Sequence, residues 1–130
     1  MDLSKEIEIA KSVRKNAYAP YTKYFVGSCL KAKSGKLYSG CNVENLGILS
    51  VCAERTAFVK ALSEGEKEFE YIVVCGGREL NKLENCLPCG YCRQFMSEFV
   101  DDNFKIFALS ENDKITEYSI LDLLPHNFKL

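Results

Sequence analysis

Residues 69–77 have the sequence Phe-Glu-Tyr-Ile-Val-Val-Cys-Gly-Gly. This run is too short and too rich in β-branched residues for a helix, so it predicts a buried strand that ends at the two glycines. Before it, residues 51–62 have a helical spacing of apolar side chains, and after it a second short helix is expected over residues 89–99. Residues 104–109 predict a further strand. Helices and strands therefore alternate through this half of the chain.

The N-terminal part of the chain predicts a helix followed by a hairpin. Apolar side chains recur at helical intervals over residues 4–17, with Ser4 as the expected N-cap and a proline that ends the helix soon afterwards. Residues 25–33 and 36–43 are two extended runs, and the Ser-Gly dipeptide between them is a hairpin turn signal. Near the other end of the chain, Ser119 is expected to cap a last helical turn.

No repeat, low-complexity tract or linker divides the sequence. Its 130 residues have the size of one compact domain, and 47% hydrophobic with 27% charged residues can build a core without disulfides. Helices that alternate with strands after an opening hairpin predict an α/β fold, namely a three-layer α/β/α sandwich with a mixed sheet. We therefore expect residues 1–130 to form a single domain.

The balance of charge restricts the partners. The sequence has 17 Lys and Arg against 18 Asp and Glu, a formal net charge of -1, and its basic residues form no stripe. Lys and Arg supply most of the affinity for a phosphate backbone. We therefore expect a small-molecule partner and no nucleic acid.

The N-terminus and the cysteines indicate the compartment. The first ten residues lack the apolar region of a signal peptide, and no run approaches the roughly 20 apolar residues that span a bilayer, so no membrane partner is expected. Seven cysteines without an export signal favour thiols that stay reduced. The expected location is the cytoplasm.

The strongest chemical signal is a pair of motifs, Cys-Ala-Glu-Arg at 52–55 and Pro-Cys-Gly-Tyr-Cys-Arg at 88–93. Zinc prefers thiolate and imidazole ligands in tetrahedral geometry, and a catalytic zinc uses three protein ligands so that water can take the fourth position. The two motifs supply three thiols, from Cys52, Cys89 and Cys92. They predict one zinc ion per chain, held by these three residues.

The neighbouring residues suit this chemistry. All three cysteines lie at expected helix N-termini, where the helix dipole favours thiolate over thiol. Three thiolates give the zinc site a formal charge of -1, and Arg55 can offset it by donating charge-assisted hydrogen bonds to the sulfurs. Glu54 can face the open position and move a proton from the bound water to a substrate. Glu54 is therefore the expected catalytic acid and base.

When each motif is considered alone, two other interpretations of the cysteines remain open. A single Cys-x-x-Cys pair is also typical of a redox dithiol. A structural zinc site would use four ligands, with Cys86 as the fourth, but it would crowd three cysteines at three-residue intervals and leave Glu54 and Arg55 without a role. The two motifs taken together favour the catalytic site.

At this point the sequence resembles the cytidine deaminase family over nearly its full length. The zinc deaminases share a non-ligand Glu and a Pro-Cys-x-x-Cys motif. A cysteine at position 52 resembles the short, homotetrameric branch, as do the runs at 19–27 and 40–45 and the Leu-Leu-Pro-x-x-Phe signature at 123–128. The resemblance implies a sheet of about five strands. It also implies a zinc cofactor and a homotetramer.

The resemblance also implies roles for residues outside the two motifs. Asn42 and Glu44 would hydrogen-bond the ribose 3′-hydroxyl, and the backbone N–H of Ala53 would hold the pyrimidine O2. Tyr24 occupies the position of an aromatic residue that stacks near the base, where the family usually has Phe. Phe128 would complete the pocket of a neighbouring subunit. Without the zinc motifs, Asn42 and Glu44 would be interpreted as turn residues after a strand, and Tyr24 and Phe128 as residues of the core.

The implied reaction is the hydrolytic deamination of cytidine and deoxycytidine to uridine and deoxyuridine, with release of ammonia, in pyrimidine salvage. The segment 46–51 departs from the family, because it is one residue shorter than usual and lacks the common aromatic. The related blasticidin S deaminases also vary there, so a modified or antibiotic nucleoside is the alternative substrate. The Asn-x-Glu-Asn pattern at 42–45 favours cytidine. A zinc-stabilised RNA-binding or editing module is the third hypothesis.

Overall fold

A mixed five-stranded sheet is the middle layer of the protein, which is described over residues 1–130 by a computed structural model. The strand order is β2-β1-β3-β4-β5, with β3 and β4 parallel and every other pair antiparallel. The strands are β1 (Phe25–Ala32), β2 (Leu37–Cys41), β3 (Phe69–Gly77), β4 (Lys105–Leu109) and β5 (Ile115–Ser119).

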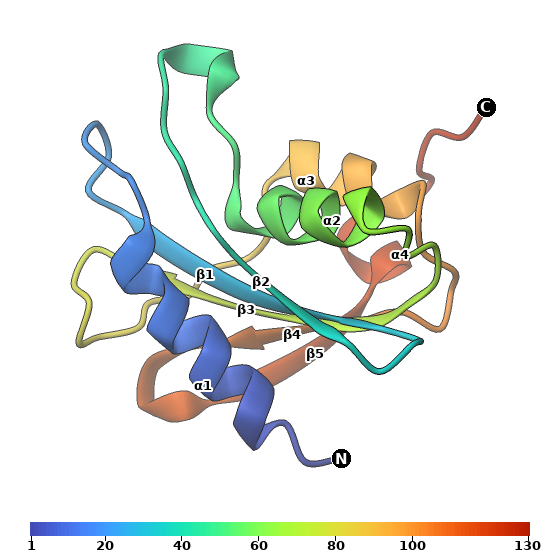
Figure 1. Cartoon of the computed structure of the whole chain (residues 1–130), viewed down its shortest axis with the longest axis horizontal. Helices are drawn as coiled ribbons and strands as arrows, with labels where there is room; N and C mark the ends of the chain where they lie inside the picture. The colour runs from blue at the N-terminus through green and yellow to red at the C-terminus, as the bar shows by residue number, and fades with distance from the viewer.

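Helices cover both faces of this sheet (Figure 1). On one face lies α1 (Ser4–Val13), which continues as a 3₁₀ turn over Arg14–Asn16. On the other face lie α2 (Ala53–Ser63), α3 (Gly90–Ser97) and the short α4 (Ile120–Leu123). The three-layer α/β/α arrangement with a mixed sheet is therefore confirmed.

The central strand β3 explains why both faces need cover. Its Ile72 and Val74 lie in the core beneath α2 and α3, whereas Tyr71, Val73 and Cys75 lie in the core beneath α1. Alternate side chains of a strand point to opposite faces, so a strand with apolar side chains on both faces, as β3 has from Tyr71 to Cys75, must lie between two layers. The predicted strand at 69–77 is confirmed, with both glycines inside it.

Two glycines let the helices approach the sheet closely. A Cβ atom at Gly27 would lie 1.9 Å from the carbonyl oxygen of Ala10 in α1. A Cβ atom at Gly40 would lie 2.3 Å from the carbonyl oxygen of Ala53, the first residue of α2. Any larger side chain at either position would force the helix away. Gly40 thus sets the depth of the α2 N-terminus, beside the end of β2.

The structure confirms one predicted helix cap, corrects the other and contains one strand that the sequence did not predict. Ser119 does cap α4, because its side chain and that of Asp122 form a reciprocal capping box. Ser4 is not an N-cap: it is the first residue of α1, and both its N–H and its hydroxyl donate to the carboxylate of Asp2. Strand β5 was not located from the sequence, because this edge strand has half-buried and exposed side chains rather than an apolar run.

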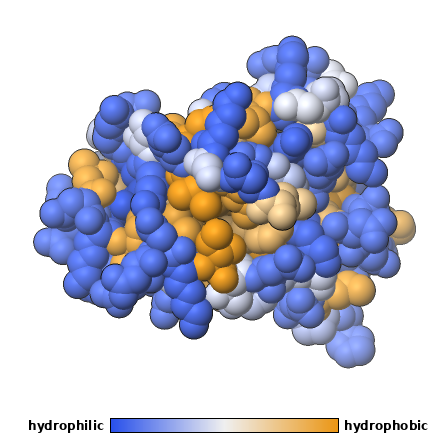
Figure 2. Space-filling view, turned by 90° about the horizontal axis from the view of Figure 1, so that it is seen from below, coloured by the Kyte–Doolittle hydropathy of each residue, from blue (hydrophilic) through white to orange (hydrophobic).

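The face of the molecule that is seen from below is mainly hydrophilic (Figure 2). Figure 2 shows the molecule from below, with hydrophilic side chains around the margin and apolar atoms gathered towards the middle. The two ends of the chain lie on different sides of the molecule (Figure 1). No helix has both the length and the apolar character needed to cross a bilayer.

Candidate functional site

The three predicted thiols come together at the N-termini of two helices. Cys52 is the N-cap of α2, Cys89 is the N-cap of α3, and Cys92 lies in the first turn of α3. The sulfur atoms of the three residues all lie within 4.8 Å of one another, and those of Cys52 and Cys89 are 3.7 Å apart. Neither N-cap sulfur is used to cap its own helix. Three thiols therefore converge on one point.

This geometry fits a tetrahedral zinc ion. At a Zn–S distance of about 2.3 Å, two ligands of a tetrahedral ion lie about 3.8 Å apart, close to the 3.7 Å between Cys52 and Cys89. Cys86, the fourth ligand of the structural alternative, is not part of the cluster. Three thiols without a fourth protein ligand match a catalytic zinc site rather than a structural one.

The surroundings of the thiols favour negative charge on sulfur. The Nη2 atom of Arg55 donates to the sulfur of Cys52 at 3.5 Å and to the carbonyl oxygen of Ser50 at 3.2 Å. Hydrogen bonds from Cys92 and then from Arg55 lower the pKa of Cys52 to about 5. The nearby Cys52 sulfur and burial raise the pKa of Cys92, because Cys92 keeps its proton beside the Cys52 thiolate, and a divalent cation bound there would displace that proton.

Glu54 lies in the first turn of α2, two residues after Cys52, and its side chain is only 3% exposed. Burial raises the pKa of Glu54 to about 7, and the nearby Cys52 acts in the same direction. A carboxyl group in this range can accept and donate a proton near neutral pH. A buried carboxylate thus lies beside the thiol cluster, without an ion-pair partner among the salt bridges of the chain.

A pocket of 420 Å³ is lined by the predicted sugar-binding residues and by one thiol of the cluster, that of Cys52, but by neither Ala53 nor Glu54. Asn42 and Glu44, which follow β2, line it together with Cys52, which directly precedes α2. The other lining residues come from the segment before β1 and from the loop between β2 and α2: Tyr21, Thr22, Asn45, Leu46, Gly47, Ser50 and Val51.

Hydrogen bonds to the start of β1 and to the segment before it fix Asn42, and hydrogen bonds to that segment alone fix Glu44. The side-chain amide of Asn42 accepts from the N–H of Val26 at 2.9 Å and donates to the carbonyl oxygen of Tyr24 at 2.8 Å. The carboxylate of Glu44 accepts from the N–H of Thr22 at 3.1 Å and from the hydroxyl of Thr22. It also accepts from the N–H of Tyr21 at 2.9 Å.

The remaining predicted residues are more scattered. Ala53 is fully buried at the start of α2, where the first N–H groups of a helix have no partner within it, and its carbonyl oxygen accepts from Ser28 at 2.9 Å. Tyr24 is half-buried, with its ring near the sulfur of Cys86. Phe128 does not line the pocket: it is 65% exposed, and its carbonyl oxygen accepts from Gln94 in α3.

The sequence did not reveal two contributors to this site. Thr22 gives two hydrogen bonds to Glu44, and the polar run that precedes β1 was the only signal for it. Arg93 supports the second cysteine motif, because its Nε donates to Pro88 at 2.7 Å and its Nη1 donates to Leu123 at 2.9 Å. These bonds tie the start of α3 to the end of α4.

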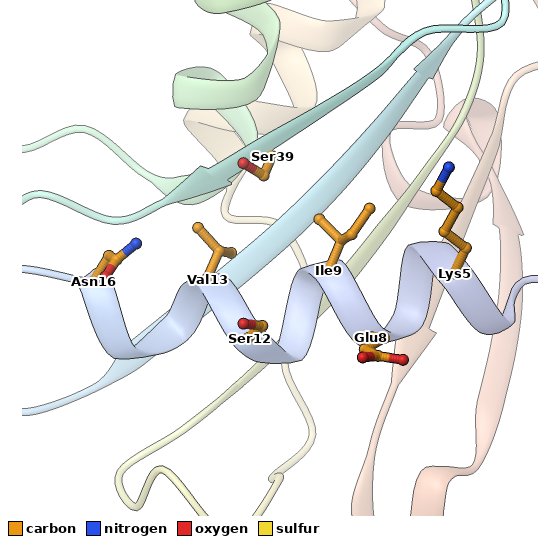
Figure 3. A pocket seen from close by; sticks show the side chains of 7 residues that line it. All are labelled: Lys5, Glu8, Ile9, Ser12, Val13, Asn16 and Ser39. Atoms are coloured by element: carbon orange, nitrogen blue, oxygen red, sulfur yellow. The ribbon is translucent and has the colours of Figure 1, made fainter.

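Another hollow, of 480 Å³, lies along α1 and is seen in Figure 3. Its walls are the side chains of Lys5, Glu8, Ile9, Ser12, Val13, Asn16 and Ser39. It contains no thiol or imidazole and none of the predicted site residues, so the pocket beside Cys52 is the candidate functional site.

Comparison with known proteins shows which family the chain resembles. The family described as the cytidine and deoxycytidylate deaminase zinc-binding region matches residues 2–108. A cytidine deaminase of Sporosarcina psychrophila is 39% identical over 129 residues, which are 98% of this chain and 92% of that protein. A cytidine deaminase from Burkholderia pseudomallei has a crystal structure that superposes with a TM-score of 0.86 at 38% identity, covering 98% of this chain and 100% of that one.

A deaminase of another kind is also related. The blasticidin-S deaminase of Bacillus cereus is 31% identical over 108 residues, covering 79% of this chain and 76% of that protein. The fold and the three-thiol site are those of a zinc-dependent hydrolase. The chain belongs to the cytidine and deoxycytidylate deaminase zinc-binding family, so the resemblance seen in the sequence is confirmed.

Proposed function

We propose that this enzyme catalyses the hydrolytic deamination of cytidine and deoxycytidine to uridine and deoxyuridine, with release of ammonia. One observation carries the proposal: a single pocket of 420 Å³ is lined by Asn42, by Glu44 and by the thiol-bearing Cys52. A nucleoside has a polar sugar joined to a base, so a sugar held by Asn42 and Glu44 would direct its base towards the cysteines. Membership of the family supports the same reaction.

In this proposal Cys52, Cys89 and Cys92 hold the metal. When bound there, zinc supplies the Lewis acidity that makes water a nucleophile near neutral pH. Arg55 offsets the negative charge of the sulfurs through its contact with Cys52. The helix N-termini that carry Cys52 and Cys89 act in the same direction.

Glu54 moves the protons of the reaction. Its carboxylate takes a proton from the attacking water and delivers it to ring N3 of the pyrimidine, which prepares C4 for attack. The oxygen of water bonds to C4, the bond from C4 to the exocyclic nitrogen breaks, and ammonia leaves with the second proton. The burial of Glu54, which raises its pKa to about 7, supports both its acid and its base steps.

Substrate binding is assigned to the groups around the pocket. Asn42 and Glu44 would bind the ribose 3′-hydroxyl, because both are already held in place by backbone groups of Tyr21, Tyr24 and Val26, at and just before the start of β1. The free N–H of Ala53 at the start of α2 would hold the pyrimidine O2. The half-buried ring of Tyr24 would stack near the base.

The substitution Glu54→Gln tests the assignment of the proton carrier. It keeps the shape of the side chain but removes its ability to carry a proton, so kcat for cytidine should fall by about 10²- to 10⁴-fold. Zinc content and thermal stability should remain at wild-type values. The exposed Glu98→Gln, at the end of α3, is the control and should keep full activity. Comparable turnover by Glu54→Gln would exclude Glu54 as the proton carrier.

The alternative substrate is a modified or antibiotic nucleoside such as blasticidin S. The Asn-Val-Glu-Asn sequence at 42–45 and the pocket beside it favour an unmodified ribose. Rates measured with cytidine, deoxycytidine and blasticidin S on zinc-assayed protein separate these possibilities. A zinc-stabilised RNA-binding or editing module is the third hypothesis, and salt-sensitive binding to single-stranded RNA without nucleoside turnover would support it.

We also propose a homotetramer, in which Phe128 of one chain completes the pocket of another. Exposed apolar side chains support assembly: Ile48 is 95% exposed at the tip of the segment between β2 and α2, which projects from the body of the molecule (Figure 1), and Phe128 is 65% exposed. Light scattering should give the mass of four chains. All seven cysteines are free, which supports a reducing cytoplasm as the location. The deamination of free nucleosides would serve pyrimidine salvage. Residues 1–130 would form one catalytic domain.

A further inference from the structure

An aromatic ring lies against the arginine of the thiol cluster. The guanidinium carbon of Arg55 is 4.1 Å from the centroid of the Tyr91 ring. Arg55 belongs to the first turn of α2, and Tyr91 belongs to the first turn of α3. The contact therefore joins the two helices whose N-termini carry the cysteines. Tyr91 itself lies between the two cysteines of the second motif.

The position of Tyr91 is not explained by the core. Its side chain is 65% exposed, and it belongs to neither of the two apolar clusters of the protein. A large aromatic side chain with this exposure makes its main contact with a neighbouring surface side chain and not with the core. Here the neighbour is a cation, and a cation within about 6 Å of a ring centroid is attracted to the face of the ring.

The hydrogen bonds of Arg55 leave part of its side chain unsupported. Its Nη2 atom donates to Cys52 and to Ser50, but its Nε atom is buried and has no hydrogen-bond partner. The guanidinium group is therefore held at one end by hydrogen bonds and on one face by the Tyr91 ring. Without the ring, that face would be open to water and the side chain could adopt other rotamers.

We propose that Tyr91 is a positioning residue of the metal centre, which acts by holding the guanidinium group of Arg55 against the sulfur of Cys52. This inference rests on the proposed function in one respect, since it requires zinc on the three thiols. A partner that orients a group contacting a metal ligand affects both metal retention and activity. Tyr91 touches neither the substrate nor the sulfurs in this role.

Zinc release tests the proposal without relying on turnover. Zinc-loaded protein is mixed with an excess of a chromogenic chelator, and the rate of zinc transfer is followed for the wild type, Tyr91→Phe and Tyr91→Leu. Loss of an exposed cation–π contact changes a rate or equilibrium constant by about two- to fivefold, so Tyr91→Leu should release zinc faster than the wild type by this factor. Tyr91→Phe keeps the ring and should behave as the wild type. Tyr91→Ala carries the same expectation as Tyr91→Leu, in case the latter does not fold.

The same substitutions in an Arg55→Met background show whether Tyr91 acts through Arg55. In that background Tyr91→Leu should have no further effect on zinc release, because the cation is absent. When Arg55 is unchanged, Tyr91→Leu should lower kcat for cytidine with little change in KM. Three results would each overturn the proposal. In the first, Tyr91→Leu and Tyr91→Ala release zinc at the wild-type rate. In the second, Tyr91→Leu speeds zinc release as much in the Arg55→Met background as in the wild type, and in the third, Tyr91→Phe speeds it as much as Tyr91→Leu does. A protein that binds zinc but deaminates no nucleoside would contradict the proposed function and leave the zinc-release result valid.

Discussion

The Sγ atoms of Cys52 and Cys89 lie 3.7 Å apart, although 37 residues separate the two cysteines in the sequence. Each residue is the N-cap of a helix, and both helices pack on the same face of the sheet. Between them the chain forms α2, the whole of β3 and a loop of about a dozen residues. The distance between these sulfurs is therefore a result of how α2 and α3 are placed on the sheet.

Replacing Cys89 by Ser should release the metal. Loss of a partner that merely contacts a metal ligand costs about 10- to 100-fold in affinity, so loss of a ligand should cost more. We expect zinc in Cys89→Ser to fall well below one ion per chain after dialysis against a competing chelator. Elemental analysis of the dialysed protein measures this. Cys41→Ser, at a half-buried cysteine outside the cluster, should keep its zinc. Full zinc content in Cys89→Ser would exclude Cys89 as a ligand.

The stability of the protein should depend on pH through Glu44. Burial acts to raise the pKa of this carboxyl, but the hydrogen bonds from Thr22 and Tyr21 outweigh it and hold the pKa below the usual value of 4.5. A carboxyl group whose pKa is lower in the folded protein stabilises it above the unfolded pKa, and this contribution is lost as the pH falls through the folded pKa. The wild type should therefore lose more free energy of unfolding between about pH 6 and about pH 3 than Glu44→Gln does.

Urea unfolding of both proteins at the two pH values measures this difference. Zinc is released by acid from both, so the comparison between them isolates the carboxyl group. Glu98→Gln serves as the matched control and should follow the wild type. Equal losses for the wild type and Glu44→Gln would mean that the hydrogen bonds to Glu44 do not form in solution.

Arg14 should contribute strongly to stability. Arg14 is 2% exposed, and its guanidinium group donates only to backbone carbonyl oxygens, at the start of β1, at the end of β3 and in the loop beyond it. These acceptors belong to Phe25, Gly77, Glu79, Leu80 and Lys82. Hydrogen bonds to a charged group contribute about 1.5–3 kcal/mol each, so Arg14→Met should lower the free energy of unfolding by about 3 kcal/mol or more.

The neighbouring Lys15 is exposed, so Lys15→Met is a control that should change stability by less than about 0.5 kcal/mol. Urea unfolding of the two variants against the wild type provides the measurement. A change in Arg14→Met no larger than that in Lys15→Met would show that the carbonyl groups find water when the guanidinium is removed.

Much of the fold was predictable because it depends on patterns within short stretches. The apolar run at 69–77 and the turn at 34–35 gave the central strand and the hairpin, and both are confirmed. Strand β5 was missed because an edge strand with exposed side chains has no comparable pattern. The N-cap of α1 is Leu3, one residue before the predicted Ser4. Leucine is an unusual N-cap, and the carboxylate that accepts from the N–H of Ser4 belongs to Asp2, so the pattern of capping residues did not locate the helix start.

The candidate site was predictable in part. The spacing of Cys52, Cys89 and Cys92 indicated three ligands, since it depends only on residue type and helix starts. The contacts of Thr22 with Glu44, of Tyr91 with Arg55 and of Arg14 with five carbonyl groups were not predictable. Each joins segments that no local pattern relates.

Hydrophobic periodicity and residue chemistry are local properties, so the sequence was enough to predict most of the helices and strands, though not β5, and to predict the three thiols of the site. The tertiary structure brings the N-termini of α2 and α3 together, and it places the residues that follow β2 beside Cys52 in one pocket. Packing explains this arrangement: Gly40 lets the start of α2 lie directly on β2, and the shared core beneath α2 and α3 brings their N-termini together.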